Sequence, residues 1–151
     1  DKIMELRLSR LNTTERLQVT NLLKQLDNTN LLDKNEIFAK LGKIIIKADT
    51  FESIEYPEEK IDCNYEIYEN IWRQASQMRK SGKLLEFADN IKCPVIAIHG
   101  DYDPHPYDGV KEPLSKYIKD FRFVLLENCG HKPWVEKYAK DKFYEILKNE
   151  L

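Results

Sequence analysis

Cysteine and glycine are scarce in this chain, and long apolar runs are missing altogether. The three cysteines, Cys63, Cys93 and Cys129, are an odd number without paired spacing, so neither a disulfide framework nor a cysteine-based metal site is expected. With five glycines and six prolines, the sequence contains no low-complexity tract, flexible linker or internal repeat. No apolar run approaches the length of a membrane-spanning helix, so the membrane is not expected as a partner.

Positive and negative charges are balanced. The 24 basic and 26 acidic residues give a formal net charge of −2, which offers no particular attraction for nucleic acid or acidic lipid. A hydrophobic fraction of 42% over 151 residues is enough for one domain with a real core. The cysteine usage favours a cytoplasmic protein. Because the sequence begins DKIMELRL, with neither an initiator methionine nor a signal-peptide pattern, residue 1 is expected to be a cut end.

Two short apolar runs in the last third of the chain predict β-strands. Val95 to Ile98 and Phe121 to Leu126 have the length and composition of strands that are buried on both faces. A strand, a helix and a second strand in this order form a βαβ unit with two parallel strands. The helix between the runs is predicted by apolar residues at helical spacing: Val110, Leu114, Tyr117 and Ile118.

Each predicted strand ends at a polar turn that contains a residue suited to proton chemistry. The first turn, in PVIAIHGDYDPHP, holds Asp103, and the second, in FRFVLLENCGHKPW, holds His131. Parallel strands end at the same edge of a sheet, so we expect the two side chains to lie close together. A carboxylate there can accept a hydrogen bond from one imidazole nitrogen and leave the other nitrogen free to accept a proton. Either residue alone is more often a turn former; the two together predict an acid–histidine pair.

These segments resemble the last two strands of the α/β-hydrolase family, with features of its proline-iminopeptidase-like branch. The run SGKLLEFADNIKCPV is similar to the family's approach to the acid-bearing strand, and HGDYD and CGHKPW are similar to its two catalytic turns. The resemblance is specific from Ile91 to Trp134 and weak before Asn64. It implies that Asp103 is the acid and His131 the histidine of a catalytic triad, whose order along the chain in this family is nucleophile, acid, histidine.

The resemblance implies hydrolysis of an ester or amide bond in a small-molecule substrate, without a metal or an organic cofactor. The family's first six strands, its oxyanion-hole loop and its Gly-x-Ser-x-Gly nucleophile turn have no counterpart in the sequence. The chain is therefore expected to be the C-terminal fragment of a serine-type hydrolase, inactive by itself. A competing hypothesis is a non-catalytic helical binding or oligomerisation module derived from a hydrolase. No serine has the context of a nucleophile: Ser9, Ser53, Ser76, Ser81 and Ser115.

The first ninety residues predict helices only. Residues 1–90 are expected to form an all-helical cap, and residues 91–151 to form the C-terminal βαβα part of an α/β fold. A short helix is expected over Ile3 to Leu11, and a solvated acidic loop over Pro57 to Asp62. Three longer helices are expected to begin at N-capping residues, and the last of them to end at Gly82. The predicted caps are Asn12 with Glu15, Asp33 with Glu36, and Asn64.

The apolar positions of the helices are expected to face the core. In the first two long helices these positions are Leu22, Leu23 and Leu26, then Ile37, Phe38, Leu41 and Ile45. In the third they are Ile67, Ile71, Ala75 and Met78. In the final helix they are Val135, Ala139, Phe143, Ile146 and Leu147.

Three further groups of residues carry alternative chemistry, and a structural role is the preferred interpretation of each. Cys129 precedes His131 by two residues, a spacing that points a thiol and an imidazole apart rather than pairing them. A metal site is disfavoured because prolines constrain the extended segment that holds its ligands: His99, Asp101, Asp103 and His105. Four aromatic residues could line a pocket of the complete enzyme, although packing accounts for them: Phe51, Tyr65, Tyr68 and Trp72.

Two parallel strands do not make a stable sheet by themselves, because their free edges present unpaired backbone groups. We therefore expect Val95 to Ile98 to pair with a second copy of the chain or with a missing N-terminal segment. A homo-oligomer with one sheet built across two copies is the preferred form.

Overall fold

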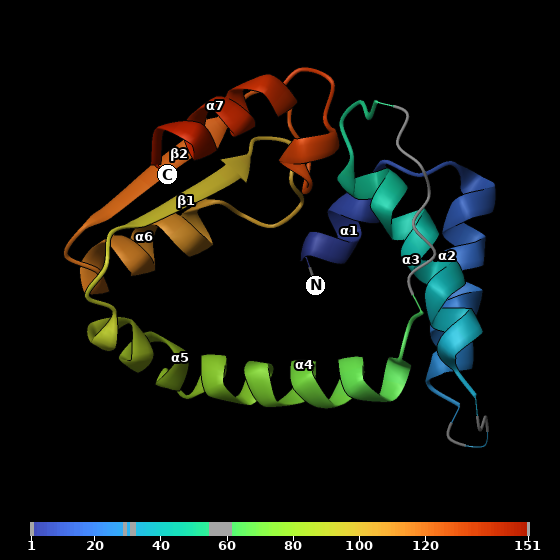
Figure 1. Cartoon of the computed structure of the whole chain (residues 1–151). Helices are drawn as coiled ribbons and strands as arrows, with labels where there is room; N and C mark the ends of the chain where they lie inside the picture. The colour runs from blue at the N-terminus through green and yellow to red at the C-terminus, as the bar shows by residue number, and fades with distance from the viewer. Residues whose placement is uncertain (1, 29, 31–32, 55–61, 151) are drawn as a thin grey trace.

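The computed structural model describes residues 2–28, 30, 33–54 and 62–150, and its fold is mixed α/β (Figure 1). The predicted acidic loop over Pro57 to Asp62 lies outside the described residues except for Asp62. Among the described residues, no helix combines the length and the apolar character needed to cross a bilayer. The helical part contains α1 (Lys2–Ser9), α2 (Thr13–Leu26), α3 (Asn35–Asp49), α4 (Tyr65–Lys80), α5 (Lys83–Glu86) and η1 (Phe87–Asn90). The remainder contains β1 (Val95–Gly100), α6 (Asp108–Tyr117), β2 (Phe121–Leu126), η2 (Pro133–Val135) and α7 (Lys140–Glu150).

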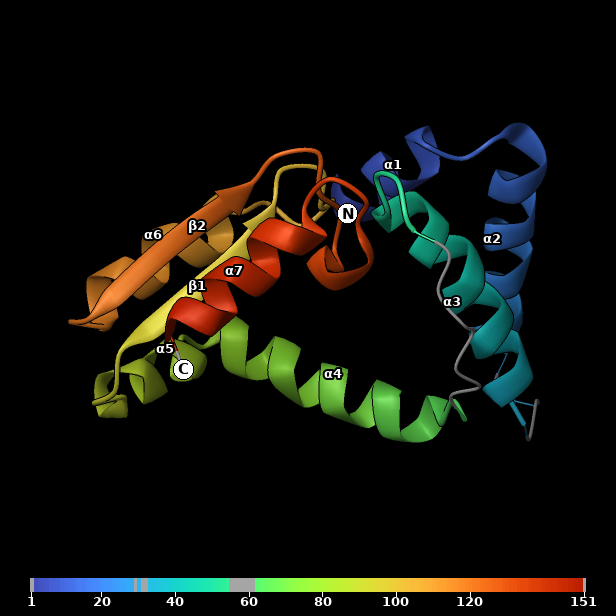
Figure 2. The ribbon, with the colours of Figure 1, turned by 45° about the horizontal axis from the view of Figure 1, so that its top comes forward.

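The predicted βαβ unit is confirmed. β1 and β2 pair in parallel, with Val95 opposite Phe121 and Gly100 opposite Leu126, so both strands end at the same edge of the sheet. Figures 1 and 2 show α6 on one face of the sheet and α7 on the other.

Side chains of the two strands alternate between these helices. Ile98 and Val124 point to the face of α7 and pack in one core cluster with Ile146. His99 and Phe123 point to the opposite face, where both rings contact the ring of Tyr107 at the start of α6. The prediction that both strands are buried on both faces was wrong, however, because most of their positions are only partly buried. A sheet of two strands leaves one edge of each strand without a neighbour, so the helices alone do not exclude solvent.

The first three helices form a separate hydrophobic core. The predicted capping box of α2 is confirmed: Asn12 Oδ1 accepts a hydrogen bond from Glu15 N (2.9 Å), and Glu15 Oε2 accepts one from Asn12 N (3.0 Å). The cap predicted at Asp33 was wrong, because α3 begins after Lys34, without a side-chain cap. Asp33 instead accepts from the backbone of Asn35 in a short turn. This core buries Leu11, Val19, Leu26, Leu41 and Ala48, while Leu22, Leu23, Ile37, Phe38 and Ile45 pack at its margin.

Helix α4 has the predicted ends but not the predicted burial. Asn64 Oδ1 caps it by accepting from Ile67 N (3.0 Å), and Gly82 follows its end with a left-handed φ of 80°. The apolar face was expected to be covered, yet Ile67 is 57% exposed and Ile71 is 60% exposed. In Figures 1 and 2, α4 runs from beside α3 to α5. Helical periodicity identifies an apolar face but not the surface that covers it.

The last two helices follow their predicted patterns in part. Ala139 and Ile146 are buried and Phe143 packs against them, as expected for the final helix. Leu147 is more exposed than predicted, and Val135 lies in the short η2 rather than in α7. In α6, Tyr117 is exposed.

A buried carboxylate joins the helical part to the sheet. Glu136 is fully buried, and its oxygens accept hydrogen bonds from the backbone N–H groups of Phe51, Glu52 and Gly130, each at 2.9 Å. Ser53 adds an isolated antiparallel bridge to Glu136. The segment after α3 is therefore attached to the chain between β2 and α7, on the other side of the division predicted near Ile91.

Gly130 allows this close approach. A Cβ at Gly130 would overlap the carbonyl oxygen of Asp49 and Oε1 of Glu136. Any larger residue would therefore push the two segments apart, and the carboxylate of Glu136 would lose its backbone donors.

We predict that Glu136→Gln lowers the free energy of unfolding by about 2 to 3 kcal/mol, because an amide cannot accept hydrogen bonds at both of its terminal atoms as a carboxylate does. Urea denaturation followed by circular dichroism measures the change. Glu127→Gln is the matched control, since Glu127 is exposed and its substitution should change stability by less than about 0.5 kcal/mol. Equal stability of the two variants would contradict a central role for Glu136.

Candidate functional site

The candidate site lies where the two strands end. The loops that follow β1 and β2 are held together by backbone hydrogen bonds from Asp101 N to Leu126 O and from Tyr102 N to Cys129 O, both 2.9 Å long. The carboxylate of Asp101 adds a bond from Cys129 N (3.1 Å). These contacts fix the two loops side by side and set the positions of the residues that come next, Asp103 and His131.

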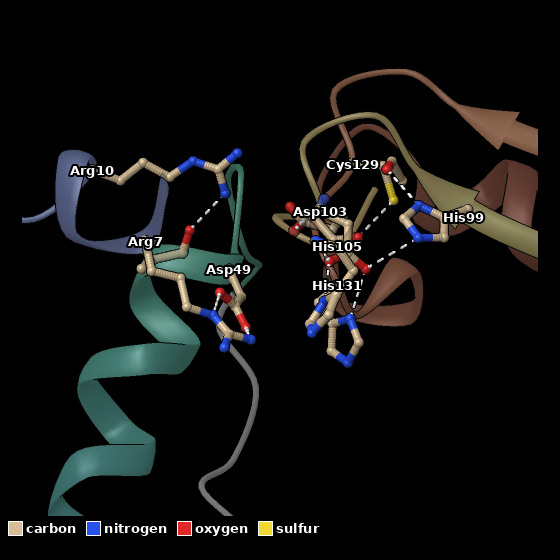
Figure 3. Close-up of polar contacts among 12 residues, drawn as sticks. Arg7, Arg10, Asp49, His99, Asp103, His105, Cys129 and His131 are labelled. Atoms are coloured by element: carbon tan, nitrogen blue, oxygen red, sulfur yellow. Dashed lines mark hydrogen bonds and ion pairs between the residues drawn. The ribbon is translucent and has the colours of Figure 1, made fainter. Parts of the chain in front are cut away.

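Asp103 and His131 meet as predicted. The Nδ1 atom of His131 lies 2.6 Å from Oδ2 of Asp103. The other carboxylate oxygen, Oδ1, lies 2.6 Å from Nδ1 of His105 and also accepts from His105 N at 2.9 Å. His99 approaches from a third side, with Nε2 3.7 Å from Oδ2. All three histidines of the chain therefore surround one carboxylate (Figure 3).

Burial and hydrogen bonding act in opposite directions on Asp103, whose side chain is only 6% exposed. Burial by itself raises the pKa of Asp103, but the hydrogen bonds from His105 and His131 outweigh it and hold that pKa well below its ordinary value. An ionised carboxylate only accepts hydrogen bonds, so Nδ1 of each contacting imidazole carries the proton. In neutral His131 the Nε2 atom is then the proton acceptor.

The same contact changes the acidity of His131. The hydrogen bond to Asp103 raises the pKa of His131 above its ordinary value, although partial burial of the ring opposes the shift. The side chain is 51% exposed, so its Nε2 is open to solvent or to a reacting group. An imidazole held in one tautomer by a buried carboxylate can act as a general base and stabilise the resulting imidazolium.

The helical part of the chain helps to position His131. The backbone N–H of His131 donates to the carbonyl oxygen of Asp49 at 2.8 Å. The carboxylate of Asp49 is in turn fixed by the guanidinium of Arg7, with contacts of 2.7 and 2.6 Å. Figure 3 shows Arg7 and Asp49 beside the acid–histidine cluster. No local sequence pattern indicates this contact, because residues so far apart in the chain meet only through the tertiary fold.

His105 has a larger part in the site than the sequence predicts. The sequence places it only in a disfavoured metal set with His99, Asp101 and Asp103, whereas in the structure it is a direct partner of Asp103. The Asp-Pro-His spacing carries the relevant signal, because an Asp side chain often accepts from the backbone N–H two residues later. Asp101 instead supports the backbone of Cys129.

Cys129 is not suited to nucleophilic chemistry. Its side chain is fully buried, and burial, with the negative charges of Glu136 and Asp101, raises the pKa of Cys129 to about 12. Its Sγ donates weakly to the carbonyl of Gly130 (3.4 Å). Three serines use their hydroxyl groups on a carbonyl three residues earlier: Ser9, Ser81 and Ser115.

The predicted aromatic group divides into two separate clusters. Tyr65 and Tyr68 contact Phe38 in the helical core, and Trp72 contacts Tyr68. Phe51 lies elsewhere, against Tyr102 and Tyr138. This second cluster adjoins the candidate site, because Tyr102 immediately precedes Asp103, and the guanidinium carbon of Arg10 lies 3.6 Å from the centre of the Tyr102 ring.

Comparison with known protein families, curated proteins and solved structures finds no match for this chain. The α/β-hydrolase resemblance therefore stays a prediction. The geometry of the site comprises a buried carboxylate and two imidazoles bonded to it, of which that of His131 is 51% exposed.

We predict that Asp103→Asn returns the pKa of His131 toward its ordinary value of 6.5, because the neutral amide no longer stabilises the imidazolium. The titration of the His131 ring is followed by NMR. Asp101→Asn is the matched control, since this carboxylate bonds to the Cys129 backbone and the pKa of His131 should stay raised. Equal titration curves for Asp103→Asn and the unmodified chain would remove Asp103 as the cause.

The raised pKa also predicts how stability depends on pH. Because the pKa of His131 is higher in the folded chain, the ionic contribution of His131 to stability is fully present below pH 6.5 and is lost as the pH rises through the raised value. The stability difference between the unmodified chain and His131→Gln should therefore decrease over this range. Urea denaturation at a series of pH values measures it, and a difference that grows with rising pH would contradict the assignment.

Proposed function

We propose that this chain is the cap and C-terminal part of a serine-type α/β-hydrolase that cleaves an ester or amide bond in a small molecule. Asp103 orients His131, and His131 is the general base for a serine supplied by a segment outside these 151 residues. The observation that carries the proposal is the 2.6 Å contact between Asp103 Oδ2 and His131 Nδ1, at the edge where two parallel strands end. This is the arrangement that an acid–histidine pair of a triad requires.

The roles follow from the protonation states of the pair. The Nδ1 proton of His131 is held by Asp103, so Nε2 can take the proton of the attacking hydroxyl. The negative charge of Asp103 then stabilises the imidazolium, which gives its proton to the leaving group in the next step. Burial of Asp103 supports this role, because water competes poorly for a carboxylate that is only 6% exposed.

The free edge of β1 supports a further part of the proposal. Within the part of the chain that the structure describes, β1 pairs with β2 along one edge, and no strand pairs with its other edge. Beside it lies an open groove of about 390 Å³ lined by Pro94, Ile96, Ile98, Ile146, Leu147 and Glu150. We infer that another strand pairs here, from an N-terminal segment of the same protein or from a second copy, and that the nucleophile belongs to the completed sheet.

A second candidate function is a non-catalytic binding or oligomerisation module. One observation favours it: among the described residues, α4 exposes Ile67, Ile71 and Trp72. Exposed apolar side chains grouped on one helix are typical of a surface that binds a partner. This function requires no particular geometry of Asp103 and His131, so loss of their contact would leave it unaffected.

We predict that the chain alone hydrolyses an alkyl ester at the background rate, because none of the residues that the structure describes offers His131 a suitable nucleophile. In the longer protein that supplies the serine, His131→Ala and Asp103→Asn should each lower kcat by about 10⁴-fold. The matched control is Ser115→Ala, since the Ser115 hydroxyl bonds to the Glu112 carbonyl and kcat should be unchanged. Turnover by the chain alone that His131→Ala abolishes would place the nucleophile within these residues, and full activity of His131→Ala in the longer protein would exclude His131 as the base.

A further inference from the structure

His105 is bonded directly to Asp103, yet the proposed hydrolysis does not use it. Its Nδ1 atom lies as close to the carboxylate as that of His131, at 2.6 Å. One donor atom from each of Asp103, His105 and His131 can be chosen so that all three lie within 4.8 Å of one another. Two imidazole nitrogens and a carboxylate oxygen are ligands that transition metals favour.

The cluster is open on the side of the imidazoles and closed on the side of the carboxylate. The side chains of His131 and His105 are 51% and 37% exposed, whereas that of Asp103 is 6% exposed. The two rings have centroids 5.0 Å apart, and Figure 3 shows them extending from Asp103 in about the same direction. An ion from solvent can therefore reach all three ligands without unfolding the loop.

We propose that Asp103, His105 and His131 bind one Zn²⁺ ion, with solvent at the fourth position. Zinc binds imidazole nitrogen and carboxylate oxygen at about 2.0 to 2.2 Å, which places tetrahedral ligands about 3.3 Å apart. His105 and His131 now contact different oxygens of Asp103, Oδ1 and Oδ2, each at 2.6 Å, so both rings must turn until their nitrogens lie about 3.3 Å from one shared oxygen and from each other. Rotation of two exposed imidazoles provides this movement.

The imidazoles can exchange their hydrogen bonds to Asp103 for bonds to the metal ion without a net loss of protons. In each neutral imidazole the proton moves from Nδ1 to Nε2, which frees the Nδ1 lone pair for the metal, and the carboxylate stays ionised throughout. The positive charge of Arg7 acts on His131 and would repel a metal ion there. Arg7 is already paired with the carboxylate of Asp49, which offsets this repulsion. A charge of −1 with two nitrogen ligands suits Zn²⁺ better than Ca²⁺ or Mg²⁺, which prefer oxygen ligands.

The metal and the proton compete for the same imidazole. A Zn²⁺ ion on His131 would occupy the ring that the proposed hydrolysis uses as a base. Asp103 would then bind the ion instead of orienting His131. Zinc would therefore act as an inhibitor. The binding itself is independent of the proposed hydrolysis, because it needs neither a nucleophile nor a substrate.

The test is calorimetric titration of Zn²⁺ into the 151-residue chain, with folding checked by circular dichroism. We expect one ion per chain, and we expect His105→Gln and His131→Gln each to weaken binding by at least about 100-fold, since loss of a ligand costs at least as much as loss of a supporting contact. Glu145→Gln is the matched control: Glu145 lies on α7, pairs with Lys142 and is outside the three-ligand group, so its substitution should leave the affinity within about threefold. Cys93→Ser should also bind normally, which excludes the exposed thiol as the ligand.

Several outcomes would overturn the site. These are no binding by the folded chain, unchanged affinity in folded His105→Gln, or loss of binding in Cys93→Ser. Cobalt substitution gives an independent readout, because a thiolate-to-metal charge-transfer band would place the ion on a cysteine instead. If zinc does not bind, the effect of Asp103 on the pKa of His131 is unchanged. If the hydrolase proposal fails, zinc still binds in the calorimetric titration, so the two results are distinguishable.

Discussion

The carboxylate of Glu136 is the interaction on which the site depends. It is fully buried and accepts three backbone N–H groups, two from the segment after α3 and one from Gly130. Moving a carboxylate from water to the protein interior costs free energy unless new hydrogen bonds replace those to water. Here the three backbone N–H groups replace them, and the carboxylate in turn pairs donors that would otherwise be unpaired. The consequence reaches the site directly, because Gly130 precedes His131 and Asp49 holds the backbone of His131.

Around this anchor, one carboxylate organises all the imidazoles of the chain. Asp103 contacts His105 and His131 by hydrogen bonds and has His99 at 3.7 Å. Its pKa is shifted in the direction of ionisation because the donors outweigh burial. A carboxylate in this position can orient a base for proton transfer or join a metal site. The proposed hydrolysis and the proposed zinc binding are thus alternative uses of one arrangement, selected by what reaches the outer side of the two rings.

Prediction from sequence succeeded for features that short-range patterns decide. It failed for features that depend on whether another segment packs over a face. Both strands, their parallel pairing and the meeting of Asp103 with His131 follow from apolar runs and from the geometry of a crossover connection. The capping box at Asn12 is local as well. The exposed face of α4 and the half-exposed strands were missed, because a period of 3.6 or 2 residues shows which side chains share a face but not whether anything packs against it.

The sequence by itself determined the elements, their order and the edge at which an acid and a histidine come together, because these depend on backbone hydrogen bonding and on residue spacing. The tertiary structure alone decided that His105 shares the carboxylate, that Asp49 and Glu136 hold the loop of His131, and that Phe51 lies beside Tyr102. The contacts of Asp49 with His131 and of Phe51 with Tyr102 join residues distant in the chain. Their formation depends on how two separate cores are packed, and no local pattern encodes that packing.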